Sequence, residues 1–439
     1  MTPGLPFPRK NFPRWIFPFA LAFCGYALLA FCARAPGRLP VGIWWSAQAV
    51  GWIACAWFLR AAVTGGWPAT RWIVLSALAL RYCGLWAPPT LEDDYHRYLW
   101  DGWRTLQDGS PYDRAPADFF SVNETRPPEI ETALNEVNNP GLTTIYSPVT
   151  ESLFAVAALI APGSLFVLKV LLLAIDGAVI LLLAVCGGRA AAWFYGWCPL
   201  VIAETAFHAH PDAWAVLWLL AAWLCARRER FLFAGALAGV AVGAKIFAFF
   251  ATPFLIWRRP ALFLPTFLLA LGLIYGPFLA AGSSAEWGAL HVMASDFEFN
   301  SFGYAVLAFC CGTKAARVLW LVLAGVIALN LFVRWVWRKQ SQAQAPVVDL
   351  WLAFLLLSPV LNPWYLIGLV PFVALQPTRR AVALLLVVPL SYATGLNLAE
   401  PSLASYALPA WVRPVEFGIF FLALLSEFCR VPTNSKTRS

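Results

Sequence analysis

Long apolar runs recur along almost the whole chain, separated by short polar stretches that carry most of the basic residues. An α-helix needs about 20 apolar residues to cross the hydrocarbon core of a bilayer, and these runs are of spanning or near-spanning length. The pattern predicts an all-α polytopic membrane protein, a bundle of about 12–14 transmembrane helices of which some are half-length. The expected helices cover residues 15–33, 41–60, 72–88, 164–186, 190–206, 211–226, 231–257, 261–280, 315–334, 347–361, 364–376, 381–398 and 411–429.

Basic clusters mark the helix ends that face the cytoplasm, because Lys and Arg are enriched on that side of a membrane. From a cytoplasmic N-terminus, three crossings bring the chain outside at residue 88. Residues 88–147 are therefore predicted to form an extracytoplasmic loop within a single transmembrane domain, residues 1–429. The segment 430–439 is expected to be a cytoplasmic tail. The basic clusters include Arg9, Lys10, Arg14, Arg60, Arg71, Arg189, Arg227, Arg228, Arg230, Arg258, Arg259, Arg334, Arg338, Lys339, Arg379 and Arg380.

Two apolar stretches do not fit this count of crossings. Residues 148–161 follow the outer loop and precede a helix that starts outside, so we expect a re-entrant or juxtamembrane helix there. Residues 231–257 have arginines at both ends, which predicts two half-depth helices with a turn near Gly243–Lys245. Irregular backbone inside a membrane persists only where it is buried in protein or lines a cavity. Both stretches therefore indicate a cavity that opens to the outer face.

The composition excludes an ordinary soluble protein. Apolar residues make up 61% of the 439 positions and charged residues 12%, against about 45–50% and about 25% in soluble domains. The net charge is +8, yet residues 88–147 carry eleven acidic residues against four arginines. The basic excess thus belongs to the cytoplasmic helix ends and does not indicate nucleic-acid binding. The ten cysteines lack metal-ligand spacing, and we expect them to be packing residues.

The densest polar signal is EDDYHRYLWDG, residues 92–102, just beyond the third expected helix. Glu92, Asp93 and Asp94 begin it, and an amphipathic helix is expected to follow. Acids at a membrane–water boundary suit a general base, or a divalent cation such as Mg²⁺ or Mn²⁺ held by these three carboxylates. The alternative interpretation is a solvated acidic loop.

Ionisable residues inside apolar runs are costly and usually face a cavity or a partner. Lys245, at the expected half-helix turn, is predicted to bind an anion, and the alternative is an internal ion pair with Asp176 or Asp349. Lys169 and Asp176 are seven residues apart and lie on one helix face. An internal ion pair between them is therefore the alternative to a functional role for these two charges.

A further polar group surrounds the start of the expected helix 211–226. His208, His210 and Asp212 have spacing that fits a metal site, but hydrogen bonding to a polar substrate is the preferred interpretation. Glu204 lies in the preceding apolar run, where a carboxylate also needs a partner.

Three aromatic residues stand beside prolines at outer helix boundaries: Tyr146 in TIYSP, and Trp364 and Tyr365 in NPWY. Their rings are candidates to stack on a sugar or to flank a lipid chain. The alternative is the interfacial belt of aromatic residues that anchors many membrane proteins.

Several segments, in this order along the chain, resemble the bacterial mannosyltransferase-like members of the GT-C glycosyltransferases, and more distantly the first mannosyltransferase of GPI-anchor synthesis. The segment EDDYHRYLWDGWRTLQDGSPY resembles their first extracytoplasmic loop. The segments VNNPGLTTIYSPVTE, WCPLVIAETAFHAHPDAW, GVAVGAKIFAFFATPFL, FEFNS and LLLSPVLNPWYLIGLVPF resemble later parts of the family pattern, so that the resemblance extends from about residue 90 to 375. The sequence differs from the common pattern at Asn139, Ser147, Glu151 and Asn362.

The resemblance implies a GT-C-like fold and a hexosyltransferase that takes a mannose-like sugar from a polyprenyl-phosphate donor. It also implies an inverting single displacement, in which a first-loop aspartate accepts the proton of a hydroxyl on a glycan, lipid or protein acceptor. The alanine- and arginine-rich composition is typical of a bacterium, so the expected location is the inner membrane with a periplasmic site. The implied roles are catalysis for Asp93, with Asp94 in support; donor-phosphate binding for Lys245, Arg97 and His210; and substrate binding for Tyr146, Glu204, Asp212, Trp364 and Tyr365.

Two other classes compete with this interpretation. A transporter or flippase of a lipid-linked sugar also explains half-helices and buried charges, but transporters usually contain internal repeats. No second copy of the acidic loop or of the lysine turn occurs in the sequence. A membrane scaffold does not require such costly charges within its apolar runs.

Overall fold

The computed structural model describes residues 13–398, 400 and 402–429. The described chain is helical throughout, apart from connecting segments and one isolated bridge between Phe299 and Val360. Five of its helices are long and apolar enough to cross a membrane, which confirms the predicted polytopic membrane fold. The predicted tail 430–439 and the basic residues Arg9 and Lys10 lie outside the described residues. The five long helices are α1 (Ile16–Ala33), α2 (Val41–Gly65), α7 (Leu165–Trp197), α12 (Pro260–Ala280) and α15 (Thr313–Trp337).

Most of the remaining helices are too short to span a bilayer alone, as the prediction of half-length helices requires. Several of them carry a proline at one of their first two positions, where a missing N–H is tolerated. The shorter helices of the bundle are α3 (Thr70–Leu85), α9 (Asp212–Arg227), α10 (Phe231–Ala244), α11 (Thr252–Ile256), α13 (Trp287–Asp296), α14 (Gly303–Cys311), α16 (Val347–Leu357), η5 (Pro363–Leu366), α17 (Val370–Leu375), α18 (Arg379–Val387), η6 (Val388–Tyr392), α19 (Gly395–Leu398) and α20 (Val412–Phe428).

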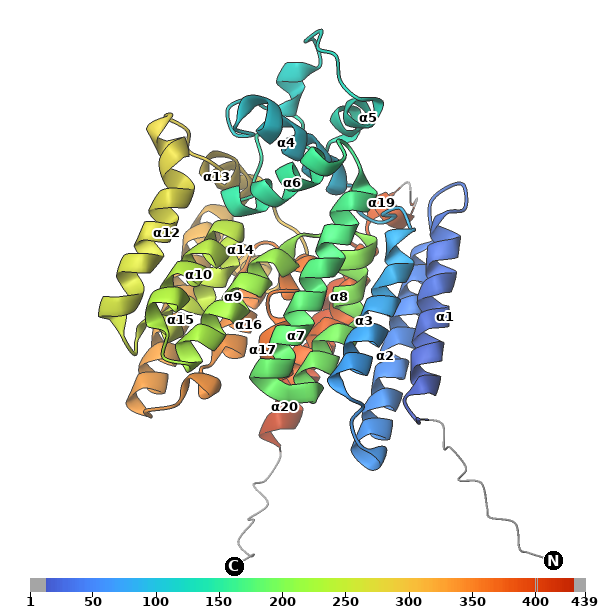
Figure 1. Cartoon of the computed structure of the whole chain (residues 1–439), viewed down its shortest axis with the longest axis vertical. Helices are drawn as coiled ribbons and strands as arrows, with labels where there is room; N and C mark the ends of the chain where they lie inside the picture. Colours follow the sequence, from blue (N-terminus) through green and yellow to red (C-terminus); the bar gives the residue numbers. More distant parts are fainter. Residues whose placement is uncertain (1–12, 399, 401, 430–439) are drawn as a thin grey trace, which may run out of the picture.

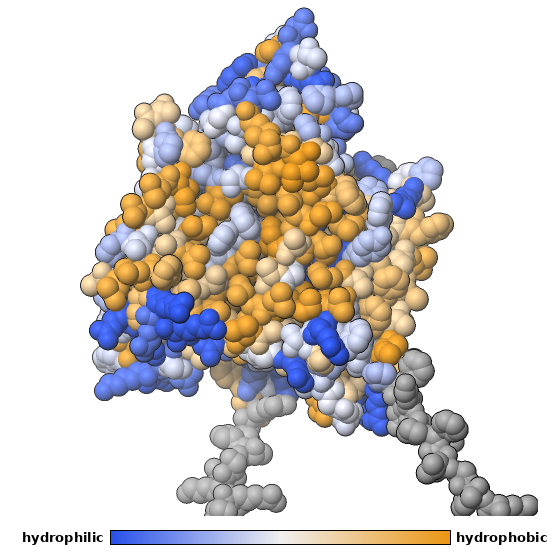
Figure 2. All heavy atoms as spheres, in the orientation of Figure 1, coloured by the Kyte–Doolittle hydropathy of each residue, from blue (hydrophilic) through white to orange (hydrophobic). Residues whose placement is uncertain are grey.

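The helices stand side by side, and a separate layer of helices and loops caps one end of the bundle (Figure 1). This layer, which we call the loop end, contains α4 (Tyr95–Asp108), α5 (Pro128–Glu136) and α6 (Pro148–Ile160). Helix α1 begins, and α20 ends, at the opposite end of the bundle (Figure 1). The visible face of the bundle carries a broad apolar belt, bordered by hydrophilic residues at the loop end and along the opposite edge (Figure 2).

Helix α7 is a hairpin rather than one long rod. Its chain reverses at Gly188, where φ is 76° and ψ is −167°, a conformation that glycine adopts without steric cost. Tyr195 Oη then donates a hydrogen bond of 2.7 Å to Asp176 Oδ1, so that the second arm lies beside the first. The second arm ends at Trp197 before Pro199, so the helix predicted over residues 190–206 is interrupted. A single turn, α8 (Pro199–Val201), and a π-helical segment, η2 (Ile202–Phe207), follow.

The predicted interruption of residues 231–257 is confirmed. Helix α10 ends at Ala244, Lys245 is extended with φ −153° and ψ 125°, and a 3₁₀ turn, η3 (Ile246–Phe250), leads into α11. The carbonyl of Ala244 accepts a hydrogen bond of 2.7 Å from Thr150 Oγ1 of α6. Because freed backbone groups at a helix break need partners inside a membrane, α6 helps to make this interruption stable.

The loop end is held together by close packing of α4 on α6. A Cβ atom on Gly102 of α4 would lie only 2.4 Å from the carbonyl oxygen of Phe154 on α6, so glycine permits this approach. Tyr98 of α4 stacks on Phe154 with ring centroids 4.7 Å apart. Helix α6 has 13 residues, fewer than a crossing requires, and its placement relative to the membrane stays a prediction.

A buried ion pair joins α3 to the α7 hairpin. Arg81 Nε lies 2.6 Å from Asp176 Oδ2, and both side chains are at most 1% exposed. The suggested pair between Lys169 and Asp176 is therefore wrong. Lys169 instead donates hydrogen bonds to the carbonyls of Gly84 and Ala87, at 3.0 and 2.7 Å, where α3 ends. Spacing along one helix identifies residues that share a face, but here each charge finds its partner on a neighbouring helix.

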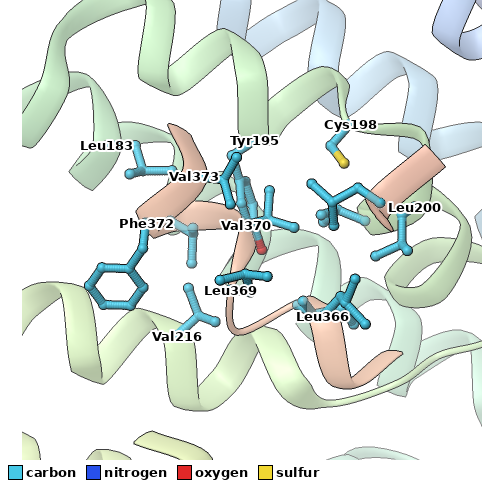
Figure 3. Close-up of a cluster of buried hydrophobic side chains, with 14 of the residues drawn as sticks. Leu183, Tyr195, Cys198, Leu200, Val216, Leu366, Leu369, Val370, Phe372 and Val373 are labelled. Carbon is cyan, nitrogen blue, oxygen red and sulfur yellow. The ribbon is translucent and has the colours of Figure 1, made fainter. Parts of the chain in front are cut away.

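The centre of the bundle is an apolar core around the α7 hairpin (Figure 3). Side chains from α7, α8 and α9 meet those of the η5–α17 segment, and all of them are at most 4% exposed. This packing fixes η5, which carries the NPWY motif, against the first half of the chain. The labelled members are Leu183, Tyr195, Cys198, Leu200, Val216, Leu366, Leu369, Val370, Phe372 and Val373.

The substitution Asp176→Asn tests the buried ion pair. It leaves the guanidinium of Arg81 without a counter-charge, and we expect the free energy of unfolding to fall by about 3–5 kcal/mol. The matched control is Asp349→Asn, because Asp349 pairs with Arg380 but its side chain is 41% exposed, and an exposed pair contributes about 0–1 kcal/mol. Reversible denaturation of the purified protein in mixed micelles measures both changes. Equal losses in the two variants would show that Asp176 does not stabilise the fold through a buried charge.

Candidate functional site

A cavity of about 320 Å³ lies where the loop end meets the bundle. Its polar lining includes Glu92, Asp94 and Arg97 from the start of α4 and just before it, and Lys245 from the break after α10. Residues of segments 138–147, 362–365 and 391–397 also line it. Its apolar lining includes Ile246, Phe247, Leu290, Met293, Phe297 and Phe299.

The two adjacent aspartates at the start of α4 share one hydrogen-bond donor. Asn138 Nδ2 donates to Asp93 Oδ1 and to Asp94 Oδ1, each at 2.8 Å. Of the two carboxyl groups, the one of Asp94 lines the cavity and the one of Asp93 does not. Tyr146 Oη donates a long hydrogen bond of 3.4 Å to the other oxygen of Asp94. Asp94 is thus oriented on both sides, with its carboxylate at the cavity surface.

Burial gives all three acids of the EDD motif a raised proton affinity. It raises the pKa of Asp94 and of Asp93 above their ordinary values, against the opposing effect of the Asn138 hydrogen bonds. The pKa of Glu92 is raised further, first by burial and then by the neighbouring charge of Asp94. A carboxylate with a raised pKa is a stronger base than one in water.

Arg97 does not point a free guanidinium into the cavity. Its Nη2 donates to the carbonyls of Asn138 and Asn139, both at 3.0 Å, and its Nη1 donates to the carbonyl of Leu142 at 3.1 Å. Asp101, one turn along α4, lies 3.9 Å from Nη1. Arg97 therefore fixes the segment that carries Asn138, and through Asn138 the two aspartates.

Lys245 forms an ion pair with Asp212 at the start of α9, with 2.8 Å between Nζ and Oδ1. Its side chain is 20% exposed and lies 5.4 Å from the ring centroid of Tyr365. The alternatives of a pair with Asp176 or Asp349 are wrong, because those carboxylates bind arginines of other helices. The ammonium group of Lys245 remains at the cavity surface.

Behind Asp94 lies a second polar cluster that solvent does not reach. His210 Nδ1 is 3.0 Å from Glu204 Oε2, and Tyr392 Oη donates to both oxygens of Glu204 at 3.0 and 2.8 Å. The ring of His210 stacks on Trp364, with centroids 4.2 Å apart and planes 13° apart. Glu204 and His210 are 1% and 0% exposed, so neither predicted residue contacts the cavity surface directly.

Two groups of described residues bring together side chains that could ligate a metal ion: Glu204, His208 and His210, and Glu92, Asp93 and Asp94. In the second group, the Asn138 amide donates to the two aspartates at the place where a cation would bridge them. A hydrogen-bond donor at that position does not fit a bridging divalent cation, which binds oxygen ligands.

The structure brings most of the predicted site residues to this one cavity. Tyr146, Trp364 and Tyr365 line it together with Asp94 and Lys245, although they come from distant parts of the sequence. Two residues that bind the carboxylates of this site, Asn138 and Tyr392, were not predicted from the sequence. Asn138 lies in a segment with family resemblance, VNNPG, which could have suggested it. Tyr392 lies in an ordinary apolar run and carries no signal in the sequence.

Comparison with known proteins gives one informative result. A family model described as alpha-(1→6)-mannopyranosyltransferase, N-terminal domain, matches residues 25–260, more than half of the chain. The match includes the acidic motif, Asn138, the π-helical segment with Glu204, and Lys245. No curated protein matches the chain.

Proposed function

The chain belongs to the alpha-(1→6)-mannopyranosyltransferase family, and on that premise we propose that it transfers a mannosyl group from a polyprenyl-phosphate donor to a hydroxyl of an acceptor. The acceptor is a glycan, lipid or protein at the extracytoplasmic face of a bacterial inner membrane. The observation that carries the proposal is the cavity whose lining combines Asp94, Lys245 and a set of apolar side chains. A base, a cation for a phosphate and a surface for a lipid chain meet there.

Asp94 is the proposed catalytic base. Its carboxylate accepts the proton of the acceptor hydroxyl while the hydroxyl oxygen bonds to the anomeric carbon of the sugar. The bond from that carbon to the phosphate oxygen breaks in the same step, and the polyprenyl phosphate leaves with the bonding electrons. A single displacement of this kind inverts the anomeric configuration. This assignment moves the base from Asp93 to its neighbour, because Asp94 is the one at the cavity surface.

Lys245 is proposed to hold the donor phosphate. Its ammonium group is preorganised by Asp212 and by the ring of Tyr365, and an anion at the cavity surface can approach it directly. Arg97 was expected to share this role, but its three hydrogen bonds to loop carbonyls support a role in positioning Asn138. Tyr146, Trp364 and Tyr365 offer aromatic faces for the sugar ring.

The proposed orientation rests on the charge at the two ends of the bundle. The arginines between α9 and α10, and those between α11 and α12, are exposed, and these connections lie opposite the loop end (Figure 1). Hydrophilic residues border the apolar belt along that edge (Figure 2). The positive-inside rule then supports a cytoplasmic location for that edge and an extracytoplasmic location for the cavity. The residues concerned are Arg227, Arg228, Arg230, Arg258 and Arg259.

The base assignment is tested by Asp94→Asn with Asp93→Asn as the matched control. Loss of a positioned base lowers turnover by about 10²–10⁴-fold, which we expect for Asp94→Asn, whereas Asp93→Asn retains most activity. The assay measures transfer of labelled mannose from polyprenyl-phosphate mannose to a mannoside by the enzyme in nanodiscs. The reverse ranking of the two variants would return the role to Asp93.

The pH dependence follows from the raised pKa of Asp94. The carboxylate must be ionised to accept a proton, so activity is present above its pKa and is lost as the pH falls through it. Because burial raises this pKa, we expect the acid limb of kcat/KM at a higher pH than the ordinary carboxyl value near ~4. An acid limb at or below that ordinary value would contradict the assignment.

The phosphate assignment is tested by removing Lys245 together with its partner. In the double variant Lys245→Met/Asp212→Asn no charge is left unpaired, and we expect donor KM to rise about 10–100-fold, since a hydrogen bond to a charged group contributes about 1.5–3 kcal/mol. The single variant Asp212→Asn keeps the ammonium and should retain donor affinity. An unchanged donor KM in the double variant would exclude Lys245 from donor binding.

We propose that transfer does not depend on a divalent cation at the EDD motif, because the Asn138 amide occupies the position between the aspartates. Dialysis against EDTA should change the transfer rate by less than about twofold, because the Asn138 amide pairs with one oxygen of each aspartate. A loss of activity that Mg²⁺ or Mn²⁺ restores would contradict this proposal.

A further inference from the structure

The oxygen of Asp94 that does not bind Asn138 faces a buried imidazole. His210 Nε2 lies 3.9 Å from Asp94 Oδ2. Both ring nitrogens of His210 are buried, and neither has a hydrogen-bond partner among the described residues. The separation is about 1 Å longer than a hydrogen bond, and such contacts in unliganded sites often tighten when substrate binds.

The other ring nitrogen of His210 is in close contact with a carboxylate. Its Nδ1 lies 3.0 Å from Glu204 Oε2, and Glu204 is itself held by the hydroxyl of Tyr392. Stacking on Trp364 prevents the ring from turning away. In the tautomer that carries its proton on Nδ1, the ring nitrogen nearer Asp94, Nε2, has the free lone pair.

The backbone around this pair is irregular in two places. Glu204 lies in the π-helical segment η2, and Ala209, which is fully buried, has a φ of 66°. Such π-helical turns are rare and often occur at functional sites. A positive φ at a buried alanine is strained, and strain of this kind persists where the surrounding structure imposes it. Here both irregularities lie in the segment that brings Glu204 and His210 together behind Asp94.

We propose that His210, with Glu204 behind it, is a positioning residue that relays the proton taken up by Asp94. After the acceptor oxygen has bonded to the sugar, the proton on Asp94 Oδ2 passes to His210 Nε2. The resulting imidazolium is stabilised by the carboxylate of Glu204, and Asp94 is again an anion. The proton returns through Asp94 to solvent after the products leave, so no further reactant is consumed. This inference rests on the proposed function.

The groups around His210 come from every element packed on it. Burial disfavours the imidazolium and the carboxylates of Glu204 and Asp212 favour it, so the relay depends on the balance between these two effects. The facing titratable groups are Asp94 at the start of α4, Glu204 in η2, His208 after η2, Asp212 at the start of α9 with its partner Lys245, and Tyr392 at the end of η6.

The experiment compares His210→Gln with His208→Gln by full pH profiles of transfer. His208 also touches Glu204, at 3.3 Å, but its ring stacks on Trp44. For His210→Gln we expect kcat to fall about 10–100-fold with little change in donor KM, because ground-state binding is retained. We also expect the acid limb of kcat to move to lower pH, because protonation of His210 no longer blocks the relay. For His208→Gln the acid limb should stay at its wild-type position.

The outcomes separate this inference from the function on which it rests. Wild-type enzyme that transfers no sugar from polyprenyl-phosphate mannose would overturn the proposed function, and the relay with it. Active wild-type enzyme together with an unmoved acid limb in His210→Gln would overturn the relay alone. Equal losses in the two histidine variants, with unchanged pH profiles, would assign His210 a purely structural role and also overturn the relay.

Discussion

The ion pair between Lys245 and Asp212 joins the two interrupted segments on which the cavity depends. One segment breaks the helix after α10, and the other leads from the π-helical η2 into α9. Inside a bilayer an extended residue and an unpaired charge both need partners in the protein. The pair gives each charge its partner, and Thr150 of α6 binds the carbonyl that the first break leaves free. The irregular backbone is thus stabilised where it lines a cavity, while the apolar core around the α7 hairpin packs the neighbouring helices together (Figure 3).

At the loop end, a series of hydrogen bonds positions the carboxylate of Asp94 within this framework. Lys169 binds the carbonyls at the end of α3, Arg97 binds the segment 138–142, and Asn138 binds both aspartates. Each contact is a hydrogen bond from a buried or partly buried donor, so the position of Asp94 follows from the fold rather than from a mobile loop. A base placed in this way loses little freedom when substrate binds, which is the usual benefit of preorganisation in enzymes.

Much of this architecture could be predicted from the sequence, because lengths of apolar runs and positions of arginines follow directly from bilayer physics. The break at Lys245 is an example, since arginines at both ends of one run require a turn. The family suggested by the order of the motifs is confirmed as well. What could not be predicted are partners from different helices: Arg81 for Asp176, Asp212 for Lys245, and Tyr392 for Glu204. Sequence spacing reports which residues share a face, but side chains that meet across helices depend on how the whole bundle packs.

The central claim is that one cavity at the loop end holds the donor phosphate at Lys245 and the acceptor hydroxyl at Asp94. An electron microscopy map of the enzyme in nanodiscs with bound polyprenyl monophosphate tests it most directly. The account predicts phosphate density in contact with the ammonium group of Lys245, and lipid density along the apolar lining residues, which include Phe247 and Met293. Phosphate density at the opposite edge, beside the arginines between α9 and α10, or a cavity without density while lipid is bound elsewhere, would contradict it.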